Sequence, residues 1–480
     1  MAFLVRTFGI AAVSGLVGAL SGCGSRGTLL DDYGPGGAGG GGGDGGSTTS
    51  SSTITTSSST TTSSTTTTTT TTSMGSGTVI SGSVDSMYEG ETTVVATADG
   101  TVAAAWIAVS DQGTPYIAYA FSPNDGVTWQ APIALPSPGG RFGSDPVLAT
   151  DSFGNLYLTW VGFKAPGGNV SDMQVYVATS KPGTFAFGPP MLVSDPNEPT
   201  STFLDKPWIT VTAKDSVIVS YARFADDFSI ITGRSTDFGQ SFTRTVVIQD
   251  EALTTFYNLA YLCVSKETGR LFTTYQAIQQ FGQDLSIKTM LSWSDDDGVS
   301  FPAGNFSVVS AGELDVAFGD PTCTARGSDL FVTYHLSKDP LSGEAEASQK
   351  AYSVIVRHSG NGGVSFDGLM DAGDVMTAPF FMLSDVKHED TGMLDVVYYA
   401  GSMDDDPAAS FRRARFSYGA VNQPPSDLVE SPVVMTPDRG VPYWLGDYIG
   451  HYIRGKHEYM TYVVNADFTS HVAFQRLDLP

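Results

Sequence analysis

Seven aromatic residues recur along the chain at intervals of 54 to 64 residues, each closing a short strand-like segment. They are Trp106, Trp160, Tyr221, Tyr275, Tyr334, Tyr398 and Tyr462. The segments, such as Leu156–Trp160, alternate in polarity and are rich in β-branched and aromatic residues, which favours strands. A period of this length is typical of a repeat architecture, and here it predicts one small sheet per unit.

A second motif falls between these aromatics and consists of a tight glycine turn after a further strand. Four copies are clear, and two weaker ones lie near Ser180 and Ser417. Their motif residues are Ser122, Asn124, Gly126 and Trp129; Ser235, Asp237, Gly239 and Phe242; Ser294, Asp296, Gly298 and Phe301; and Ser359, Asn361, Gly363 and Phe366. The Asp or Asn side chain can bind nearby backbone N–H groups, Gly allows a positive φ, and the last aromatic packs beneath the turn.

These turns resemble the Asp-box, or BNR, repeat of sialidase-like β-propellers. Two copies carry Asp and two carry Asn at the acidic position. The resemblance covers residues 78–480 and implies an all-β, seven-bladed β-propeller of four-stranded antiparallel blades, with a six-bladed sialidase-like propeller as the alternative. Because seven units share only six such turns, we expect Thr78–Val84 to supply the outermost strand of the last blade and so to close the ring.

The N-terminus predicts the location of the protein. Arg6 precedes an apolar run that ends in Leu20-Ser-Gly-Cys23, which resembles the lipobox of a bacterial lipoprotein signal peptide. Residues 1–22 would then be removed and Cys23 lipidated. Residues 23–77 are rich in Gly, Ser and Thr and predict a disordered tether. We therefore expect the propeller to be anchored in the bacterial cell envelope, at the outer membrane or cell surface.

Charge limits the choice of partners. The chain has 25 Lys and Arg against 50 Asp and Glu, a net charge of −25. Nucleic acids and anionic membranes are bound through Lys and Arg, so neither is an expected partner, and the membrane would be contacted through the lipid anchor only. The expected partners are a glycan or a surface protein, and the expected state is a monomer.

Candidate ligand-binding residues come from aligning the seven units on their aromatics. The aligned positions at the start of the innermost strands are Glu91, Asp145, Asp205, Ala260, Asp320, Leu383 and Asp447, of which five are acidic. An aromatic residue lies two or three positions earlier in every unit, including Tyr257 and Trp444. Carboxylates and aromatic rings that converge on one concavity suit sugar recognition, and carboxylates alone suit calcium.

A structural role for these residues is the competing hypothesis, and repetition in every unit favours it. A repeated Asp can bind the backbone of its own loop, and a repeated aromatic can pack between blades. We expect this role for at least three of Asp145, Asp205, Asp320 and Asp447. No other cofactor is expected, because the His-Glu-x-x-His zinc motif, phosphate loops and Cys-x-x-Cys pairs do not occur.

Catalysis of the sialidase type would require three arginines, a Tyr–Glu pair and an acidic acid/base. The Phe/Tyr-Arg-Ile-Pro motif that carries the first arginine in sialidases is absent, and Arg141, Arg223 and Arg454 are the nearest substitutes. The leading hypothesis is therefore a non-catalytic glycan- or protein-binding module, and the alternative is a secreted exo-sialidase-like glycoside hydrolase. A pair of the aligned carboxylates could still serve another glycoside hydrolase, since that reaction needs two carboxylates at a suitable separation.

Cys263 and Cys323 occupy nearly equivalent positions of consecutive units, 12 and 11 residues before the unit's aromatic. Both are expected on neighbouring innermost strands. A disulfide is allowed outside the cytoplasm, but Cys is also a common small buried residue, and free buried thiols are the favoured expectation.

Overall fold

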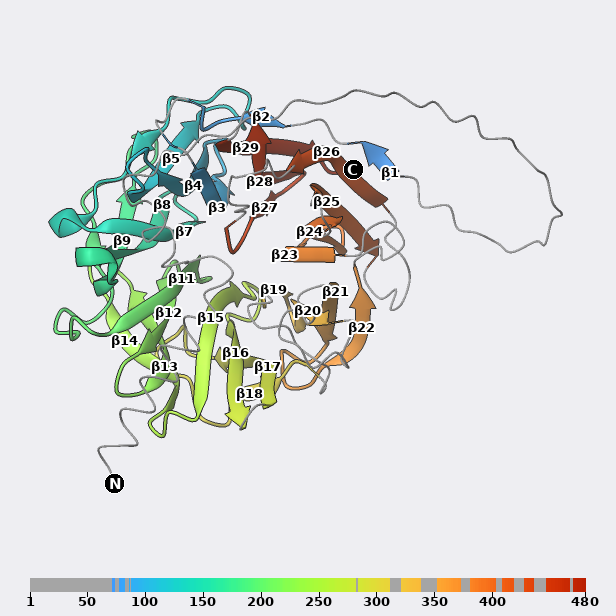
Figure 1. The fold of residues 1–480 in the computed structure, drawn as a ribbon. Coiled ribbons are helices and arrows are strands. Elements are labelled where there is room, and N and C mark those ends of the chain that lie inside the picture. Colours follow the sequence, from blue (N-terminus) through green and yellow to red (C-terminus); the bar gives the residue numbers. More distant parts are fainter. Residues whose placement is uncertain are drawn as a thin grey trace, which may run out of the picture.

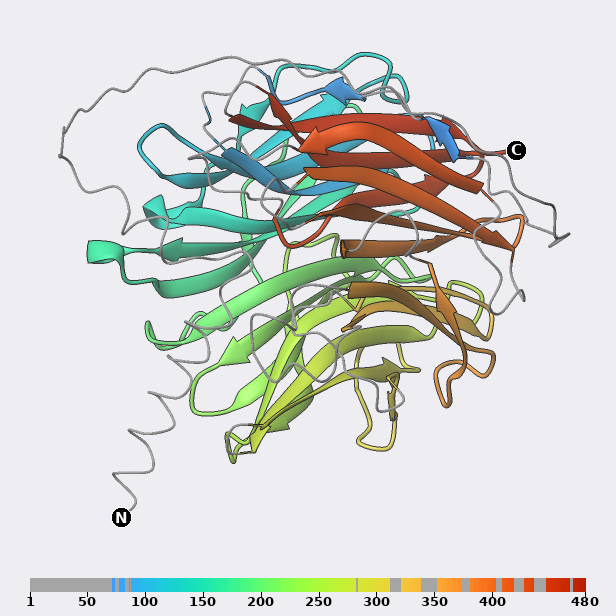
Figure 2. The ribbon, with the colours of Figure 1, turned by 45° about the vertical axis from the view of Figure 1, so that its right-hand side comes forward.

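The computed structural model describes residues 71–73, 77–82, 86, 88–281, 284–310, 321–337, 352–372, 380–402, 408–417, 427–435, 446–466 and 469–480. These residues form seven small sheets arranged around a central axis (Figure 1), and Figure 2 shows the same ring turned by 45°. No α-helix occurs in these ranges, which contain only the 3-10 turns η1 (Pro138–Gly140) and η2 (Pro166–Gly168). The fold is an all-β, seven-bladed propeller as the repeats predict, and the six-bladed alternative is wrong.

The strands of each blade are given from the central axis outward. Blade 1 contains β3 (Tyr88–Ala96), β4 (Val102–Val109), β5 (Pro115–Ser122) and β6 (Ile133–Ala134). Blade 2 contains β7 (Phe142–Thr150), β8 (Leu156–Lys164), β9 (Ser171–Ser180) and β10 (Met191–Leu192). Blade 3 contains β11 (Phe203–Val211), β12 (Val217–Phe224), β13 (Phe228–Ser235) and β14 (Thr243–Asp250). Blade 4 contains β15 (Thr255–Val264), β16 (Leu271–Phe281), β17 (Asp284–Ser294) and β18 (Phe306–Val308).

Blade 5 contains β19 (Cys323–Arg326), β20 (Asp329–Ser337), β21 (Tyr352–Ser359) and β22 (Asp367–Asp371). Blade 6 contains β23 (Phe380–His388), β24 (Met393–Ser402), β25 (Ala408–Ser417) and β26 (Asp427–Met435). Blade 7 contains β27 (Gly450–Arg454), β28 (His457–Ala466), β29 (Thr469–Asp478) and β2 (Thr78–Val79).

The repeated aromatics lie on the second strand of every blade, and all seven side chains are buried. Each blade packs on both faces against its neighbours, so these strands are apolar on both sides; all eight residues of β4 are buried. Between blades 1 and 2, for example, Tyr119 packs in one cluster with Leu158 and Trp160. The aromatic period therefore follows the layers of core between blades.

The two ends of the propeller meet in blade 7. Thr78 and Val79 pair in antiparallel register with Phe474 and Ala473, and the N–H of Ile80 donates to the carbonyl of Val472 at 2.9 Å. This confirms the expected closing strand over its described part, while residues 83–85 lie outside the described residues. Pairing the first strand with the last removes a sheet edge from the ring.

A further short strand, β1 (Thr71–Ser73), lies within the segment assigned to the tether. It pairs in parallel with Leu428–Glu430 of β26 and makes blade 6 five-stranded. Residues 1–70, including Cys23 and the predicted signal peptide, lie outside the described residues. Among the described residues, no helix has the length and apolar character needed to span a bilayer.

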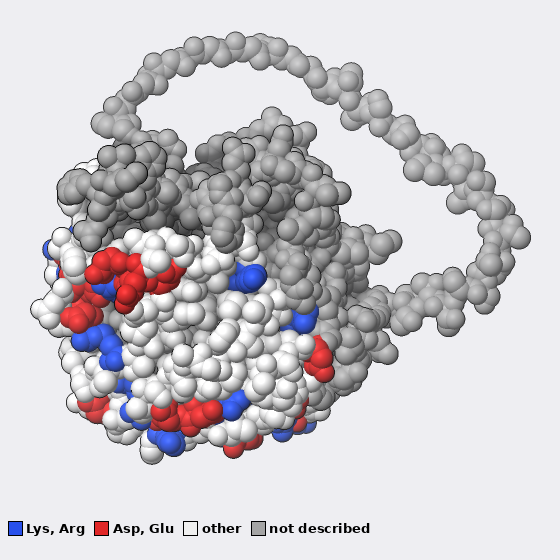
Figure 3. All heavy atoms as spheres, turned by 90° about the horizontal axis from the view of Figure 1, so that it is seen from below, with Lys and Arg blue, Asp and Glu red and all other residues white. Residues whose placement is uncertain are grey.

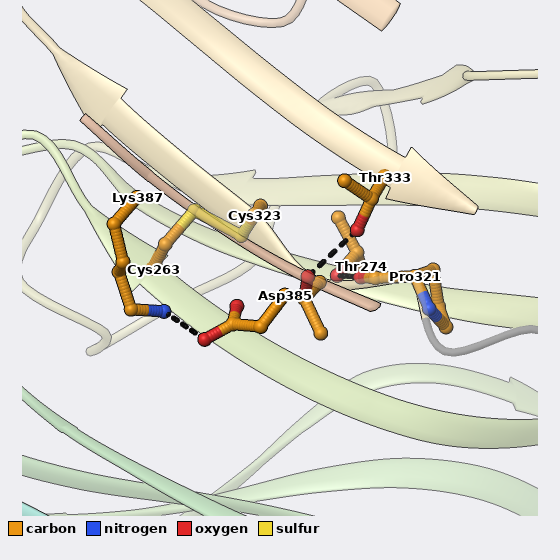
Figure 4. The surroundings of a disulfide bond; sticks show 8 residues. Cys263, Thr274, Pro321, Cys323, Thr333, Asp385 and Lys387 are labelled. Atoms are coloured by element: carbon orange, nitrogen blue, oxygen red, sulfur yellow. Dashed lines mark hydrogen bonds and ion pairs between the residues drawn. A yellow bond between two sulfur atoms is a disulfide. The ribbon is translucent and has the colours of Figure 1, made fainter. Parts of the chain in front are cut away.

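Cys263 and Cys323 form a disulfide, so the favoured expectation of free thiols is wrong. Both lie on innermost strands, β15 and β19, of neighbouring blades, and their Cα atoms are 5.7 Å apart, a separation that suits the bond. Figure 4 shows the bond beside the Asp385–Lys387 ion pair of blade 6. Sequence could place the two cysteines on adjacent strands, but only the packing of the blades sets their distance.

The disulfide is expected to stabilise the propeller because it closes a 60-residue loop in the unfolded chain. The Cys263→Ala/Cys323→Ala variant should lose roughly 2–4 kcal/mol of unfolding free energy, measured by guanidinium denaturation. Dithiothreitol should lower the stability of the wild type by a similar amount and leave that of the double variant unchanged. Equal stability of the wild type with and without the reductant would contradict the prediction.

Candidate functional site

Five of the seven innermost strands share a β-bulge near their start. The register shifts at this point in β3, β7, β11, β15 and β23. The residues with positive φ inside the bulges are Glu91, Asp145, Lys206, Leu259 and Leu383. Bulges re-aim side chains and are frequent beside functional sites.

The bulge corrects the sequence alignment by one residue in two blades. Lys206 occupies the position assigned to Asp205, and Leu259 occupies the position assigned to Ala260. A signal for the correct register was present, because Asp145 and Lys206 both precede a proline. A proline inside a strand marks a bulge, where its missing N–H costs no ladder hydrogen bond. The site therefore contains a lysine that the alignment overlooked.

Lys206 lies at the centre of a group of carboxylates that we call the lysine cluster, comprising Glu91, Asp145, Asp205, Lys206 and Asp447. The ammonium Nζ donates to Asp145 Oδ1 at 2.7 Å, to Glu91 Oε1 at 3.3 Å and to Asp447 Oδ2. The Lys206 side chain is only 9% exposed. One side chain from blade 3 thus joins blades 1, 2 and 7 across the axis.

Asp205 has hydrogen-bond partners other than the Lys206 ammonium. Its Oδ1 accepts the backbone N–H of Lys206 at 3.0 Å, and its Oδ2 accepts from Asn258 Nδ2 of blade 4 at 3.4 Å. Asp205 thus has the bond to its own loop that a structural role requires. Asp145 and Asp447 instead bind the lysine of another blade.

The cluster is strongly coupled electrostatically. Burial, followed by the neighbouring Asp145 carboxylate, raises the pKa of Glu91 well above its usual value. Burial also raises the pKa of Asp205 to about 7, although Lys206 acts in the opposite direction. Burial alone would lower the pKa of Lys206, but Asp145, Asp447 and Glu91 raise it well above its usual value. Lys206 is therefore a cation at neutral pH, and Glu91, Asp205 and Asp447 hold protons more tightly than exposed acids do.

Blade 7 is fitted closely around this group. Gly446 has φ 84°, and a Cβ there would lie 2.2 Å from the backbone nitrogen of Glu91, so only glycine allows the approach. Tyr448 donates its hydroxyl to the carbonyl of Pro146 at 2.9 Å, and its ring lies 5.8 Å from Lys206 Nζ. Beyond Tyr448, a channel cavity of about 500 Å³ is lined by the innermost strands and the disulfide.

A second buried charge network, absent from the sequence predictions, joins blades 6 and 7. Arg413 of β25 contacts Asp395 of β24 and reaches Glu458 of β28 at 2.9 Å. His451 Nε2 lies 3.0 Å from Glu458 Oε1, and Arg415 forms two 2.7 Å hydrogen bonds with Glu389. No periodic signal marked these residues: Arg413 and Arg415 share β25, Asp395, His451 and Glu458 lie on β24, β27 and β28, and Glu389 follows β23.

Two neighbouring acids of this network have opposite pKa shifts. Burial, and then the Glu458 carboxylate, raise the pKa of Asp395 to about 10. Burial would also raise the pKa of Glu389, but the hydrogen bonds from Arg415 and its other partners lower it to about 2. Asp395 is thus protonated at neutral pH and Glu389 is ionised.

The glycine turns lie on the opposite face of the ring from the starts of the innermost strands, because successive strands alternate in direction. In all four clear copies, the Gly N–H donates to the Ser hydroxyl oxygen at 2.9 Å. The Asp or Asn oxygen accepts the N–H four residues later at 2.8–3.0 Å. The terminal Trp129 ring packs against Phe474 of blade 7 with 4.8 Å between centroids. These residues tie the turns down and join neighbouring blades.

The face on which the innermost strands begin, called here the strand-start face, carries the remaining candidates. Tyr257 is half-buried and packs its ring edge on Tyr275 at 5.8 Å. Arg141 binds Asp172 at 2.7 Å, and Lys164 joins the same carboxylate at 2.8 Å. Arg223 is surrounded by Glu198, Asp226 and Asp227. Asp320 and Trp444 lie outside the described residues.

The three arginines nearest to a sialidase triad therefore have separate partners. Arg454 lies at the far end of β27 and binds Asp125 of a glycine turn at 2.7 Å, on the opposite face from Arg141 and Arg223. Seen from below (Figure 3), the described surface carries separate acidic groups with Lys and Arg between them and no continuous basic patch.

Comparison with known proteins supports the fold. No protein-family profile matches the sequence, and no curated protein matches it. An ulvan lyase of polysaccharide lyase family PL25 has a TM-score of 0.51 at 11% identity, with 82% of this chain and 96% of that chain covered. A protein of unknown function from Dyadobacter fermentans has a TM-score of 0.48 at 13% identity, covering 84% and 98%. Trypanosoma rangeli sialidase has a TM-score of 0.45 at 13% identity, covering 79% and 65%. The likeness to the lyase supports the β-propeller fold alone.

Proposed function

We propose that this protein is a lipid-anchored envelope protein whose propeller binds a glycan without cleaving it. The observation that carries the proposal is the pairing of Lys206 with three of the aligned carboxylates. Acids held by a buried ammonium cannot act as the free acid and nucleophile or base of a glycoside hydrolase. The separation of Arg141, Arg223 and Arg454 argues in the same direction, because a substrate carboxylate would need them in one place.

A binding surface for sugar is available on the strand-start face of blade 2. Phe142 and Phe163 are both half-exposed, and their rings meet edge to face at 5.6 Å. Arg141 and Lys164 lie next to them in sequence, and both bind Asp172. Aromatic faces stack on the C–H faces of sugars, while the charged groups can bind hydroxyls. A surface of this kind gives modest affinity and needs no catalytic group.

Binding and cleavage can be separated on the full-length protein. We expect the protein to bind a subset of the glycans on an array and to release no fluorophore from a fluorogenic sialoside. Phe142→Ala should weaken glycan binding about tenfold. For comparison, the stacking of a nucleic-acid base on an aromatic side chain is worth roughly 1–3 kcal/mol. Phe238→Ala, which removes an exposed ring on the opposite face, is the matched control. Sialoside turnover, or equal effects of the two variants, would rule the proposal out.

The anchor has its own test. Cys23→Ala should move the protein from the membrane fraction to the soluble fraction without changing its thermal unfolding, because the Gly-, Ser- and Thr-rich stretch that follows Cys23 has few apolar side chains for a propeller core. Retention of the variant in membranes after a high-salt wash would refute lipid anchoring at this residue.

A further inference from the structure

The lysine cluster has too little positive charge for the acids that it buries. Four carboxylates and one ammonium carry a formal charge of −3 when all are ionised. Among the described residues, no second Lys or Arg forms an ion pair with these four acids. Buried carboxylates are costly unless they are paired or bind a metal. The missing positive charge must come from bound protons or from a cation.

One oxygen of the cluster also has no partner. Glu91 is only 2% exposed, and its Oε1 binds Lys206 while its Oε2 accepts no hydrogen bond. Both oxygens belong to one carboxylate, so Oε2 lies within the same group as the oxygens of Asp145 and Asp447. One ligand oxygen from each of Glu91, Asp145 and Asp447 lies within 4.8 Å of the other two.

Lys206 uses only one oxygen of each of these three carboxylates. Its contacts are with Glu91 Oε1, Asp145 Oδ1 and Asp447 Oδ2. Glu91 Oε2, the second oxygen of one of these acids, is buried without a hydrogen-bond partner and remains for another ligand. Asp447, at 13% exposure, is the least buried of the three side chains and the point of access.

We propose that Glu91, Asp145 and Asp447 bind a divalent cation, calcium, beside the Lys206 ammonium. Calcium takes carboxylate oxygens in flexible geometry and completes its coordination with water, whereas magnesium requires a near-ideal octahedron. Three acids from blades 1, 2 and 7 hold the ion at the seam where the N- and C-terminal segments close the ring. The ion would therefore join the first and last blades in addition to Lys206.

Terbium luminescence and thermal unfolding test the site on the full-length protein after treatment with EDTA, at pH 8. Terbium replaces calcium and is excited through nearby aromatic rings, here Tyr448 next to the cluster. We expect a luminescent complex that calcium displaces, and a melting temperature that rises by several degrees with calcium. Glu91→Gln keeps an oxygen for Lys206 and removes the charge, and it should weaken terbium binding at least tenfold.

Two further variants keep the outcome decisive. Asp172→Asn, which removes a surface acid bound to Arg141, should bind terbium as the wild type does. Asp447→Asn should repeat the loss if Glu91→Gln does not fold. The proposal would be overturned if the melting temperature of the wild type does not rise with calcium at concentrations up to about 10 mM. An equal rise in Glu91→Gln would overturn it as well. The measurement is independent of glycan binding, so failure here leaves the proposed function standing.

Discussion

Lys206→Met, measured in EDTA at pH 8, is expected to lower the unfolding free energy of the propeller by about 3–5 kcal/mol. The substitution keeps an unbranched side chain of similar volume but leaves Glu91, Asp145 and Asp447 buried without their counter-ion. A buried charge that loses its partner cannot recover its hydration. Guanidinium denaturation followed by tryptophan fluorescence provides the measurement.

The matched control is Lys164→Met, which removes a half-exposed lysine bound to a single acid, Asp172. It should cost less than about 1 kcal/mol, as exposed ion pairs do. The loss in Lys206→Met should also shrink at pH 5, because the unpaired acids can then take up protons. A loss below about 1 kcal/mol in Lys206→Met would mean that the carboxylates do not depend on the lysine.

The contribution of Asp395 to the stability of the wild type is expected to fall as pH rises above about 4. Its folded pKa of about 10 exceeds that of an unfolded Asp, so folding takes up a proton between these two values. The stabilisation that Asp395 provides is therefore complete below about pH 4 and decreases by about 1.4 kcal/mol per pH unit between the unfolded and the folded pKa. Arg413, Glu458 and Glu389 are the charged groups that face Asp395.

Asp395→Asn should remove this part of the pH dependence, because the amide resembles the protonated acid in shape and carries no titrating proton. Its stability relative to wild type should therefore improve steadily between pH 5 and pH 9 in guanidinium titrations. Asp390→Asn, at an exposed neighbouring position, should leave the slope unchanged. A wild-type slope that survives in Asp395→Asn would show that this acid is not protonated in the folded state.

Several parts of the fold could be predicted from sequence because they repeat. The seven aromatics fill equivalent core positions on the second strands, and the glycine turns recur where the third strand ends. The closing strand at Thr78 followed from counting, since one unit lacked its outermost strand. Periodic features of this kind reflect local strand pairing, which each unit specifies by itself.

The charged groups at the centre were harder to predict because their partners come from different blades. The sequence alignment identified the acids of the lysine cluster, but it missed a one-residue bulge in β11 and therefore placed Asp205 where Lys206 belongs. A shift of one residue in a strand exchanges the two faces, so the lysine that the alignment overlooked lies at the centre of the site. The Arg413 network had no repeat to reveal it.

The sequence by itself determined the propeller, the number of its blades and the way its ring closes, because each repeat encodes its own strands and turns. Only the tertiary structure decided which side chains from different blades come into contact. It brought Cys263 within bonding distance of Cys323, set Lys206 among acids of blades 1, 2 and 7, and buried Asp395 beside Glu458. The physical reason is that these contacts depend on distances between separate blades, which no local pattern of residues specifies.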